Sequence, residues 1–540
     1  MWQHVYTPAG GSLSLSTLIA SLPVVALLVV LAGFRKPSWI ASIAGLLTAG
    51  IVAVAVYGMP VSLAVSAVGY GAAQGLFPIG WVVFSAILLY NITVTTGQFD
   101  TVRASVANLT GDRRLQALLI AFAFGAFIEG AAGFGTPVAV AAAMLTGLGF
   151  PAFRAAGICL LANTAPVAFG SIGTPLIMLA TVTGLPLLQL SAGVGRICAP
   201  VSLFIPGYLV MVMGGWKALK GVLPAALICG ISFAGMQFVI SNFVGAELTD
   251  ILASLTAVTC LVILLRMWKP RDTFHLEGDG PLQPTKSIPV GQILYAWTPF
   301  ALLVACVLIW GVKPVQAQLG HASIKFPWPG LHRLILRMPP VVTKATPYDA
   351  IYNFTWLSAS GTACLIAALL SALVARMSPK VLFGVLMKTV RQLVLAETTI
   401  AVVLGLAFLM NYSGATGTLG LAFATTGKMF PFFGALLGWV GVFLTGSDTS
   451  ANALFGSLQV VTAQKLHMNA VLMAAANSSG GVMGKMISLQ NIAVAAAATS
   501  LATADESRLF RFTLRHSIFL ACVIGAIAMV YAYATPGFTQ

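Results

Sequence analysis

Two carboxylates lie inside long apolar runs of this 540-residue chain, each beside a break of small residues. Glu129 stands in AFAFGAFIEGAAGFGTPVAV (121–140), and Asp448 stands in FLTGSDTSANALFG (443–456). An ionised carboxylate in hydrocarbon is costly, so it persists only where it faces a cavity or a bundle interior. Burial also favours the protonated form, which brings proton uptake and release towards physiological pH. Both acids are therefore candidate proton-coupling groups; the alternative is a structural buried acid.

A lysine, Lys485, occupies similar surroundings in NSSGGVMGKMISLQN (477–491). Its ammonium can neutralise Asp448 or receive an anionic solute, and the sequence leaves both roles open. Broken helices also present N-terminal backbone NH groups, which favour a carboxylate ligand. We expect a binding site for a small hydroxylated anion, formed by Gly133, Gly135, Thr136, Asn163, Thr164, Ser450, Asn452, Ser478, Ser479, Lys485 and Gln490. Further neutral donors are Ser171, Thr174, Ser447, Thr449 and Asn491.

Weaker site candidates are Asn91, Asn411, Glu397 and Arg196. Glu397 lies on an otherwise regular apolar run, where structural and functional roles are equally reasonable. Arg196 fits a residue that extends to the lipid headgroups. The other acids of the 13 are expected in loops or near the ends of apolar segments. No Walker loop, zinc-type histidine cluster or hydrolase elbow is present, so we expect no catalytic residue, metal or cofactor.

The composition identifies the elements that must hold these residues. Apolar residues make up 59% of the chain and charged residues 8%, whereas soluble domains contain about 25% charged residues. This predicts an all-α polytopic membrane protein with about twelve to fourteen transmembrane helices, some of them re-entrant hairpins. The net charge of +15 comes mainly from Lys and Arg in short connections, which indicates the positive-inside bias and no nucleic-acid partner.

The positive loops also predict the organisation of the chain. We expect an N-terminal half (1–268), a cytoplasmic linker (269–290) and a C-terminal half (291–540), with both termini external. The basic loop 313–353 falls on the external side, and we expect an ordered cap there; the alternative is a basic funnel for an anionic solute.

The two halves resemble each other in the order of their polar residues. Asn91 corresponds to Asn411, Glu129 to Asp448, and Asn163 to Asn477. Paired interrupted helices in corresponding positions point to a transport site near the bilayer midplane. The pattern therefore predicts two related repeats.

Four segments, GAFIEGAAGFGTPVAV (125–140), NTAPVAFGSIGTP (163–175), GSDTSANALFG (446–456) and NSSGGVMGKMISLQNIAVA (477–495), resemble hallmark segments of the bacterial L-lactate permease family. The resemblance covers essentially the whole chain. It implies a carrier of the cytoplasmic membrane with inverted repeats and an elevator-like plan, which imports L-lactate, with D-lactate and glycolate as further candidates, together with protons. Its partners would be the monocarboxylate, protons and membrane lipid.

The implied mechanism is a hypothesis. Glu129 or Asp448 takes the proton, Lys485 and backbone NH groups hold the carboxylate, and loading neutralises the site. A sodium-coupled carboxylate or dicarboxylate carrier is the main alternative, because Asn and Ser oxygens at the breaks also suit sodium. An intramembrane enzyme and a passive channel are the others, and the enzyme lacks an accompanying nucleophile or metal set.

Overall fold

The computed structural model describes residues 1–34, 36–107, 109–133, 135–272, 274 and 288–535. Within these ranges, 11 helices are long and apolar enough to cross a membrane, or 12 if the bent pair Ala152–Ala162 and Val167–Thr183 is one span. The prediction of an all-α polytopic membrane protein is confirmed, at the low end of the expected helix number. Several apolar helices are too short to cross, namely Thr136–Gly147, Ser360–Val374 and Leu489–Thr499.

The first part of the chain contains a short strand and five helices with π-helical turns between them. These are β1 (Trp2–Gln3), α1 (Leu13–Leu28), η1 (Val29–Gly33), α2 (Ser38–Ile51), η2 (Val52–Val56), α3 (Val61–Gln74), η3 (Gly75–Gly80), α4 (Trp81–Thr95) and α5 (Gln98–Ala107). Ser12 caps α1 by accepting a hydrogen bond from the Leu15 NH, whereas α2 and α3 each follow a proline, Pro37 and Pro60.

Interrupted helices and three long helices complete the first half. They are α6 (Arg113–Gln116), η4 (Ala117–Phe124), α7 (Gly125–Ala131), α8 (Thr136–Gly147), α9 (Ala152–Ala162), η5 (Val167–Phe169), α10 (Gly170–Thr183), α11 (Leu187–Gly221), α12 (Leu223–Phe243) and α13 (Thr249–Met267). Most of the expected linker, residues 275–287, lies outside the described residues.

The rest of the chain contains long helices, a loop with short strands, and further interrupted helices. Its elements are α14 (Val290–Gly311), α15 (Lys313–Gly320), β2 (Ile324–Pro327), β3 (Ile335–Arg337), β4 (Thr346–Pro347), β5 (Ile351–Phe354), α16 (Ser360–Val374), α17 (Pro379–Ser413), α18 (Ala415–Phe423), η6 (Ala424–Met429), α19 (Phe430–Thr445), α20 (Asp448–Lys465), α21 (Ala470–Gly484), η7 (Lys485–Ile487), α22 (Leu489–Thr499) and α23 (Thr503–Ala534).

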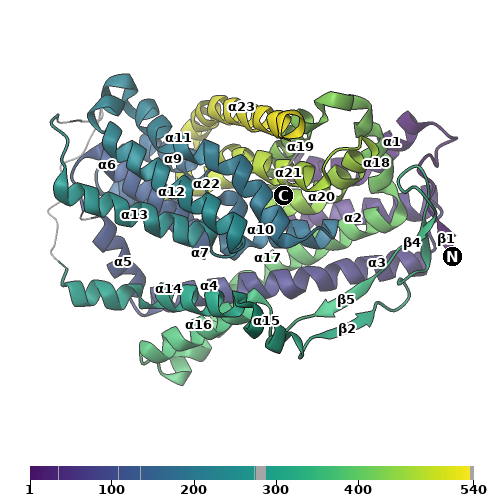
Figure 1. Ribbon diagram of the computed structural model, residues 1–540, viewed down its shortest axis with the longest axis horizontal. Helices are drawn as coiled ribbons and strands as arrows, with labels where there is room; N and C mark the ends of the chain where they lie inside the picture. Colours follow the sequence, from purple (N-terminus) through teal and green to yellow (C-terminus); the bar gives the residue numbers. More distant parts are fainter. Residues whose placement is uncertain (35, 108, 134, 273, 275–287, 536–540) are drawn as a thin grey trace.

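The interrupted helices of both halves lie together, although more than 240 residues separate the end of α10 from the start of α19 in sequence. We call α7–α10 with α19–α22 the broken-helix group, and α1–α4 with α14, α16 and α17 the flanking helix group. In Figure 1, α3, α4, α14 and α16 lie along one side of the molecule, and α17 runs between them and the broken helices. Contacts such as α10 with α20 join the two halves inside the broken-helix group.

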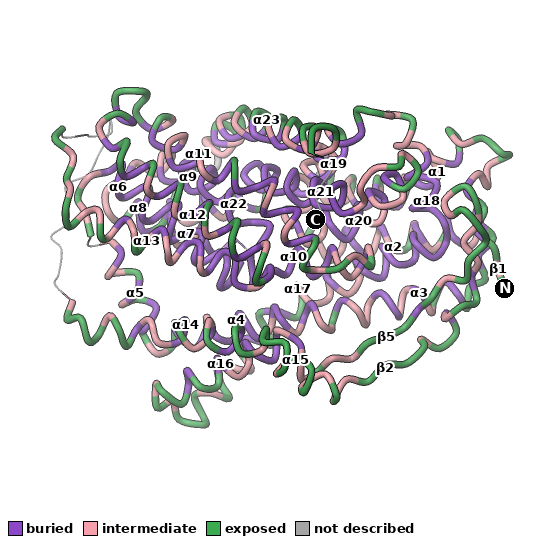
Figure 2. Tube along the Cα trace, in the orientation of Figure 1, coloured by how far each residue is buried: buried purple, intermediate pink, exposed green. Residues whose placement is uncertain are grey.

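Small residues allow the broken helices to pack backbone against backbone. A Cβ built on Gly438 of α19 would lie 1.9 Å from the Asn477 carbonyl oxygen of α21, and one built on Gly480 would lie 2.0 Å from the Ala435 oxygen. Such small-residue contacts are the usual means of close helix packing in membranes. Figure 2 shows the result, with buried residues concentrated in the broken helices and exposed ones on the outer elements.

The loop 313–353 is folded, in agreement with an ordered cap. Strand β2 pairs antiparallel with β5, and β3 pairs with both β4 and the N-terminal strand β1. Trp2 is the register partner of Ile335 in a parallel pair. The cap therefore joins the start of the chain to the second half, which the sequence did not predict because a two-residue strand has no periodic pattern.

Candidate functional site

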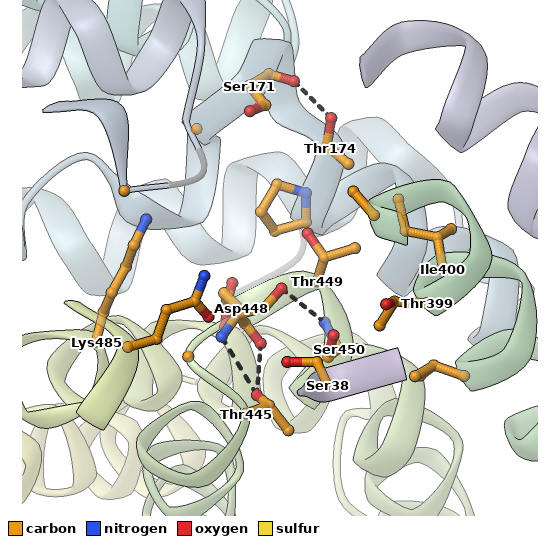
Figure 3. A pocket seen from close by; sticks show the side chains of 18 of the residues that line it. Ser38, Ser171, Thr174, Thr399, Ile400, Thr445, Asp448, Thr449, Ser450 and Lys485 are labelled. Atoms are coloured by element: carbon orange, nitrogen blue, oxygen red, sulfur yellow. Dashed lines mark hydrogen bonds between the residues drawn. The ribbon is translucent and has the colours of Figure 1, made fainter. Parts of the chain in front are cut away.

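A cavity of about 160 Å³ lies between the two helix groups. On one side it is lined by α2 and α17, which contribute Ser38, Ser42 and Thr399. On the other side it is lined by residues at the helix breaks of both halves. Figure 3 shows Asp448, Thr449 and Ser450 on one wall, with Lys485 beside them and Ser171 and Thr174 opposite. The cavity is large enough for a small organic anion, since one water in the liquid takes about 30 Å³.

An ion pair joins the two halves in this cavity. Lys485 Nζ donates to Glu129 Oε1 at 2.6 Å, and the two side chains are 8% and 3% exposed. Glu129 Oε2 has no hydrogen-bond partner among the described residues. Because one charge of a buried pair is strongly destabilising without the other, each residue depends on its partner. The sequence left open whether Lys485 neutralises Asp448; the structure pairs it with Glu129 instead.

Asp448 is held by neutral groups. Its Oδ2 accepts hydrogen bonds from Ser478 Oγ at 2.6 Å and from Asn452 Nδ2 at 3.3 Å. Asn477 in turn donates to Asn452 Oδ1 at 2.9 Å. A network of this kind orients the carboxyl group and stabilises its position without supplying a counter-charge. The sequence predicted that Asn452 and Ser478 contact the ligand. In the structure they bond to Asp448 and do not line the cavity.

Left-handed backbone shapes the breaks of the first half. Gly133 and Gly135 have φ values of +59° and +78°, which glycine adopts readily. The second break contains three consecutive residues in this region, Ser171, Ile172 and Gly173, at +45°, +57° and +73°. Ser171 Oγ donates to the Ala132 carbonyl at 2.9 Å, which ties the two breaks together. Left-handed conformations of non-glycine residues cluster at functional sites.

Four helices begin at these breaks, and their N-termini differ in capping. Ser447 caps α20 and Ser488 caps α22, each through its side-chain oxygen. By contrast, α8 begins without a side-chain cap, and regular helical backbone in α10 begins only after the left-handed residues Ser171, Ile172 and Gly173. A helix N-terminus favours negative charge, and an uncapped one also leaves NH groups for a ligand. The N-terminus of α8 is therefore suited to a carboxylate.

The predicted site residues fall into two sets. Six of them line the cavity, namely Glu129, Gly135, Asp448, Ser450, Lys485 and Gln490. Seven do not line it: Gly133, Thr136, Asn163, Thr164, Asn452, Ser478 and Ser479. Thr164 donates to the Leu161 carbonyl, so its hydroxyl satisfies the backbone. Asn163 is buried at the end of α9 with no hydrogen-bond partner among the described residues.

The weaker candidates lie away from the cavity. Asn91 donates to Thr389 and Gln392 and joins α4 to α17. Arg196 donates to Asn242 at 2.8 Å. Asn411 donates to Ser457 at 3.0 Å, beneath the cap. Glu397 packs against η3, where a Cβ built on Gly80 would contact its carboxylate.

Sequence reasoning missed one acid and four hydroxyl residues. Asp250 was expected near the end of an apolar segment; it begins α13 but is only 1% exposed. Its Cβ is 2.8 Å from a Cβ built on Gly130, the residue after Glu129, and neither carboxylate oxygen has a partner among the described residues. The hydroxyl residues are Ser38, Ser42, Thr399 and Thr445. A lone Ser or Thr in an apolar helix carries no signal, because most bond their own backbone.

The cavity adjoins a larger one of about 840 Å³. The two share lining residues, including Ser38, Thr445 and Gln490. The larger cavity extends to Lys36 and Glu506, which stand just before α2 and in the first turn of α23. The site is therefore accessible from the face of the molecule that carries Lys36.

Comparison with known proteins agrees with this architecture. The family model described as L-lactate permease matches residues 16–535. The chain belongs to the L-lactate permease family. It is 45% identical to the glycolate permease GlcA of Escherichia coli (strain K12) over 555 residues, which cover 99% of each chain. It is 47% identical to the L-lactate permease of Bacillus subtilis (strain 168) over 554 residues, covering 98% of each. It is 45% identical to the L-lactate permease of Salmonella typhimurium over 544 residues, covering 99% and 98%.

Two solved transporters share a distant likeness with this L-lactate permease family member. The YdaH transporter of Alcanivorax borkumensis has a TM-score of 0.46 and 13% identity, over 88% of each chain. MtrF of Neisseria gonorrhoeae has the same TM-score and identity, over 86% of this chain and 82% of its own. Family membership and the membrane-spanning helices together identify a multi-pass membrane transporter, and not an enzyme.

Proposed function

We propose that the protein imports L-lactate together with protons across the bacterial cytoplasmic membrane, with D-lactate and glycolate as further substrates. The names of relatives at 45% and 47% identity support the substrate class. The small cavity between the helix groups, whose wall combines charged and hydroxyl side chains with apolar ones, supports a small hydroxy acid. The Glu129–Lys485 pair is the single observation that carries the proton coupling.

Coupling follows from competition for one ammonium group. While Glu129 is ionised, it occupies Lys485 Nζ at 2.6 Å. Protonation of Glu129 removes that partner, and the lactate carboxylate then takes its place on Lys485. Charge-assisted hydrogen bonds of this type are among the strongest in proteins. Proton binding and substrate binding thus favour each other.

The same pair explains why neither ligand would cross alone. In the empty site, the pair holds one anion and one cation, and lactate that replaces the Glu129 charge on Lys485 keeps this balance. A proton without lactate would leave Lys485 unpaired, and lactate without a proton would leave two carboxylates against one ammonium. An unpaired buried charge costs about 3–5 kcal/mol, so the two balanced states are strongly favoured for the crossing step. This proposal differs from the hypothesis based on the sequence, in which loading with the proton and the substrate neutralises the site.

We assign supporting roles to the other two acids. Asp448, held in place by Ser478 and Asn452, belongs to the cavity wall beside Lys485 and is a second candidate for the proton. Asp250 packs against Gly130, the residue after Glu129, and both of its carboxylate oxygens are unpartnered among the described residues. We propose that it passes the proton to or from Glu129.

Alternating access would use the interface between the two helix groups. We propose that the broken-helix group moves against α2 and α17, in an elevator-like manner, and that residues 1–268 and 291–540 are inverted repeats. With basic loops in the cytoplasm and both termini external, the face that carries Lys36 is cytoplasmic. The cavity that reaches Lys36 then corresponds to an inward-facing state.

Uptake of labelled L-lactate into sodium-free proteoliposomes tests the proposal. An inward proton gradient should drive accumulation above equilibrium, and a protonophore should abolish it. Accumulation that requires sodium would identify the sodium-coupled alternative, and equilibration without accumulation would identify a passive pathway. Either result would contradict the proposed coupling.

A further inference from the structure

A second cavity lies beneath the cap, at the opposite end of α1 from the site. Its volume is about 120 Å³. The cap contributes Arg337, Val341 and Tyr348 to its wall, and the N-terminal segment contributes His4 and Tyr6. The rest comes from α10, α17, α18 and α20 and the turn between α17 and α18, including Asn411 and Gln464. Of the described residues that line it, Arg337 is the one with a permanent charge.

Arg337 has no ion-pair or hydrogen-bond partner among the residues that the structure describes, and its Nε is buried. The guanidinium lies over the ring of Tyr348, 4.8 Å from the ring centre. Stacking on an aromatic face leaves the N–H groups at the edge of the guanidinium free for a ligand. A planar fork of donors without an acceptor is suited to a carboxylate.

The surrounding groups keep the cavity positive and otherwise neutral. Burial lowers the pKa of His4 to about 4, and the charge of Arg337 acts in the same direction. Burial raises the pKa of Tyr6 to about 12. At neutral pH both groups are uncharged, so the field of Arg337 is not cancelled within the wall. The nearest acid in the cap, Asp349, is bonded to Arg333 at 2.7 Å.

The two cavities share three helices, α10, α17 and α20; on α17, Val403 lines the site and Asn411 the cap cavity. On α20, Ser450 and Leu454 line the site, and Ser457 and Gln464 line the cap cavity. On α10, Pro175 lines the site and Val182 the cap cavity. Seven residues of helix span about 10 Å, so the cap cavity lies roughly that far from the site along the same helices.

We propose that the cap cavity is a second binding site for a small monocarboxylate anion, in which Arg337 receives the anion on the face opposite Lys36. The identity of the anion rests on the proposed function. The cavity captures the anion while the central site is open to the other face, which raises the local substrate concentration for the next cycle.

Chemical modification of the wild-type protein tests the site without a variant. Phenylglyoxal labels arginine, and mass spectrometry reports each residue separately. L-lactate at 10 mM, a concentration chosen on the order of ten times a millimolar dissociation constant, should slow labelling of Arg337 at least fivefold. Arg333, exposed in the same cap, should label at an unchanged rate. Equal labelling of Arg337 with and without lactate would overturn the proposal.

Variants test the transport consequence. Arg337→Gln should raise the KM for uptake about fivefold, the size expected for one partly solvated charge, with the maximal rate within about twofold. The KM of Arg337→Lys should lie between those of the wild type and Arg337→Gln. Lys325→Gln makes the same charge change on the exposed strand β2, and its KM should match that of the wild type. An unchanged KM in Arg337→Gln would contradict the capture role. If the wild type transports no lactate at all, the proposed function fails, while the labelling result still decides the cap site.

Discussion

Replacement of Glu129 by glutamine is the sharpest test of the coupling mechanism. The change keeps the size of the side chain and an acceptor for Lys485 Nζ, and removes the charge and the titration. Lys485 is 8% exposed and would lose its counter-ion, which costs about 3–5 kcal/mol for a buried pair. The ammonium should then accept lactate without a proton. We expect the variant to exchange lactate but not to accumulate it.

The magnitude follows from the gradient. One pH unit is worth about 1.4 kcal/mol per proton, so one proton per lactate supports about tenfold accumulation at equilibrium. The wild type should approach that ratio in proteoliposomes under a gradient of about one pH unit, and Glu129→Gln should stay near one. Counterflow, in which labelled lactate enters against unlabelled lactate inside, should persist in the variant and thereby prove that it is folded.

Glu397→Gln provides the matched control, since it removes an acid that packs against Gly80 outside the cavity. It should accumulate lactate like the wild type. Accumulation near tenfold by Glu129→Gln would refute the reasoning, because the proton would then bind elsewhere. Loss of accumulation in both variants would show that any acid of the bundle matters and would also contradict the specific role of Glu129.

Three further predictions address Asp250, helix packing and the cap. Asp250→Asn should slow proton-driven uptake at least tenfold while lactate counterflow stays within about twofold; an equal loss of both activities would indicate a purely structural residue. Gly438→Ala should lower the melting temperature strongly, because its Cβ would clash with the Asn477 carbonyl oxygen, and overpacking costs about 1–3 kcal/mol or more. The control Gly384→Ala, at a position with open space around it, should be neutral or stabilising. Similar melting temperatures for the two variants would contradict the packing argument. His4, whose pKa falls from 6.5 to about 4, should contribute about 3 kcal/mol to stability above pH 6.5 that is lost as the pH falls towards 4, because its protonation would oppose Arg337 and end the hydrogen bond from Tyr6. Thermal unfolding at several pH values measures this loss, and His4→Gln should remove it. An unchanged pH dependence in the variant would assign the effect to other groups.

The charged residues of the site were predictable from the sequence because charge in an apolar segment is rare and costly. Glu129, Asp448 and Lys485 all line the cavity. Their partners were not predictable. The contact between Glu129 and Lys485 spans 356 residues, and no local pattern distinguishes it from a pair with Asp448.

The neutral residues of the site were likewise predictable in position but not in their contacts. Asn452 and Ser478 stand beside the break, as expected, but they turn towards Asp448. Ser38 and Thr399 belong to regular apolar helices and reach the cavity only because the two helix groups meet there. The membrane class and the helical fold follow from composition, whereas contacts between the groups depend on tertiary packing that single-sequence patterns do not contain.

The long separation between Glu129 and Lys485 has a consequence for biogenesis. Chain growth at about 5–20 residues per second places Glu129 in the membrane before its cation, 356 residues later, is made. The delay is about 20–70 s at those rates. During this time the acid has no counter-charge, so it must insert in its neutral form or remain near the translocation machinery. The pair should therefore act as an assembly checkpoint, at which the first half becomes stable only when the second half docks.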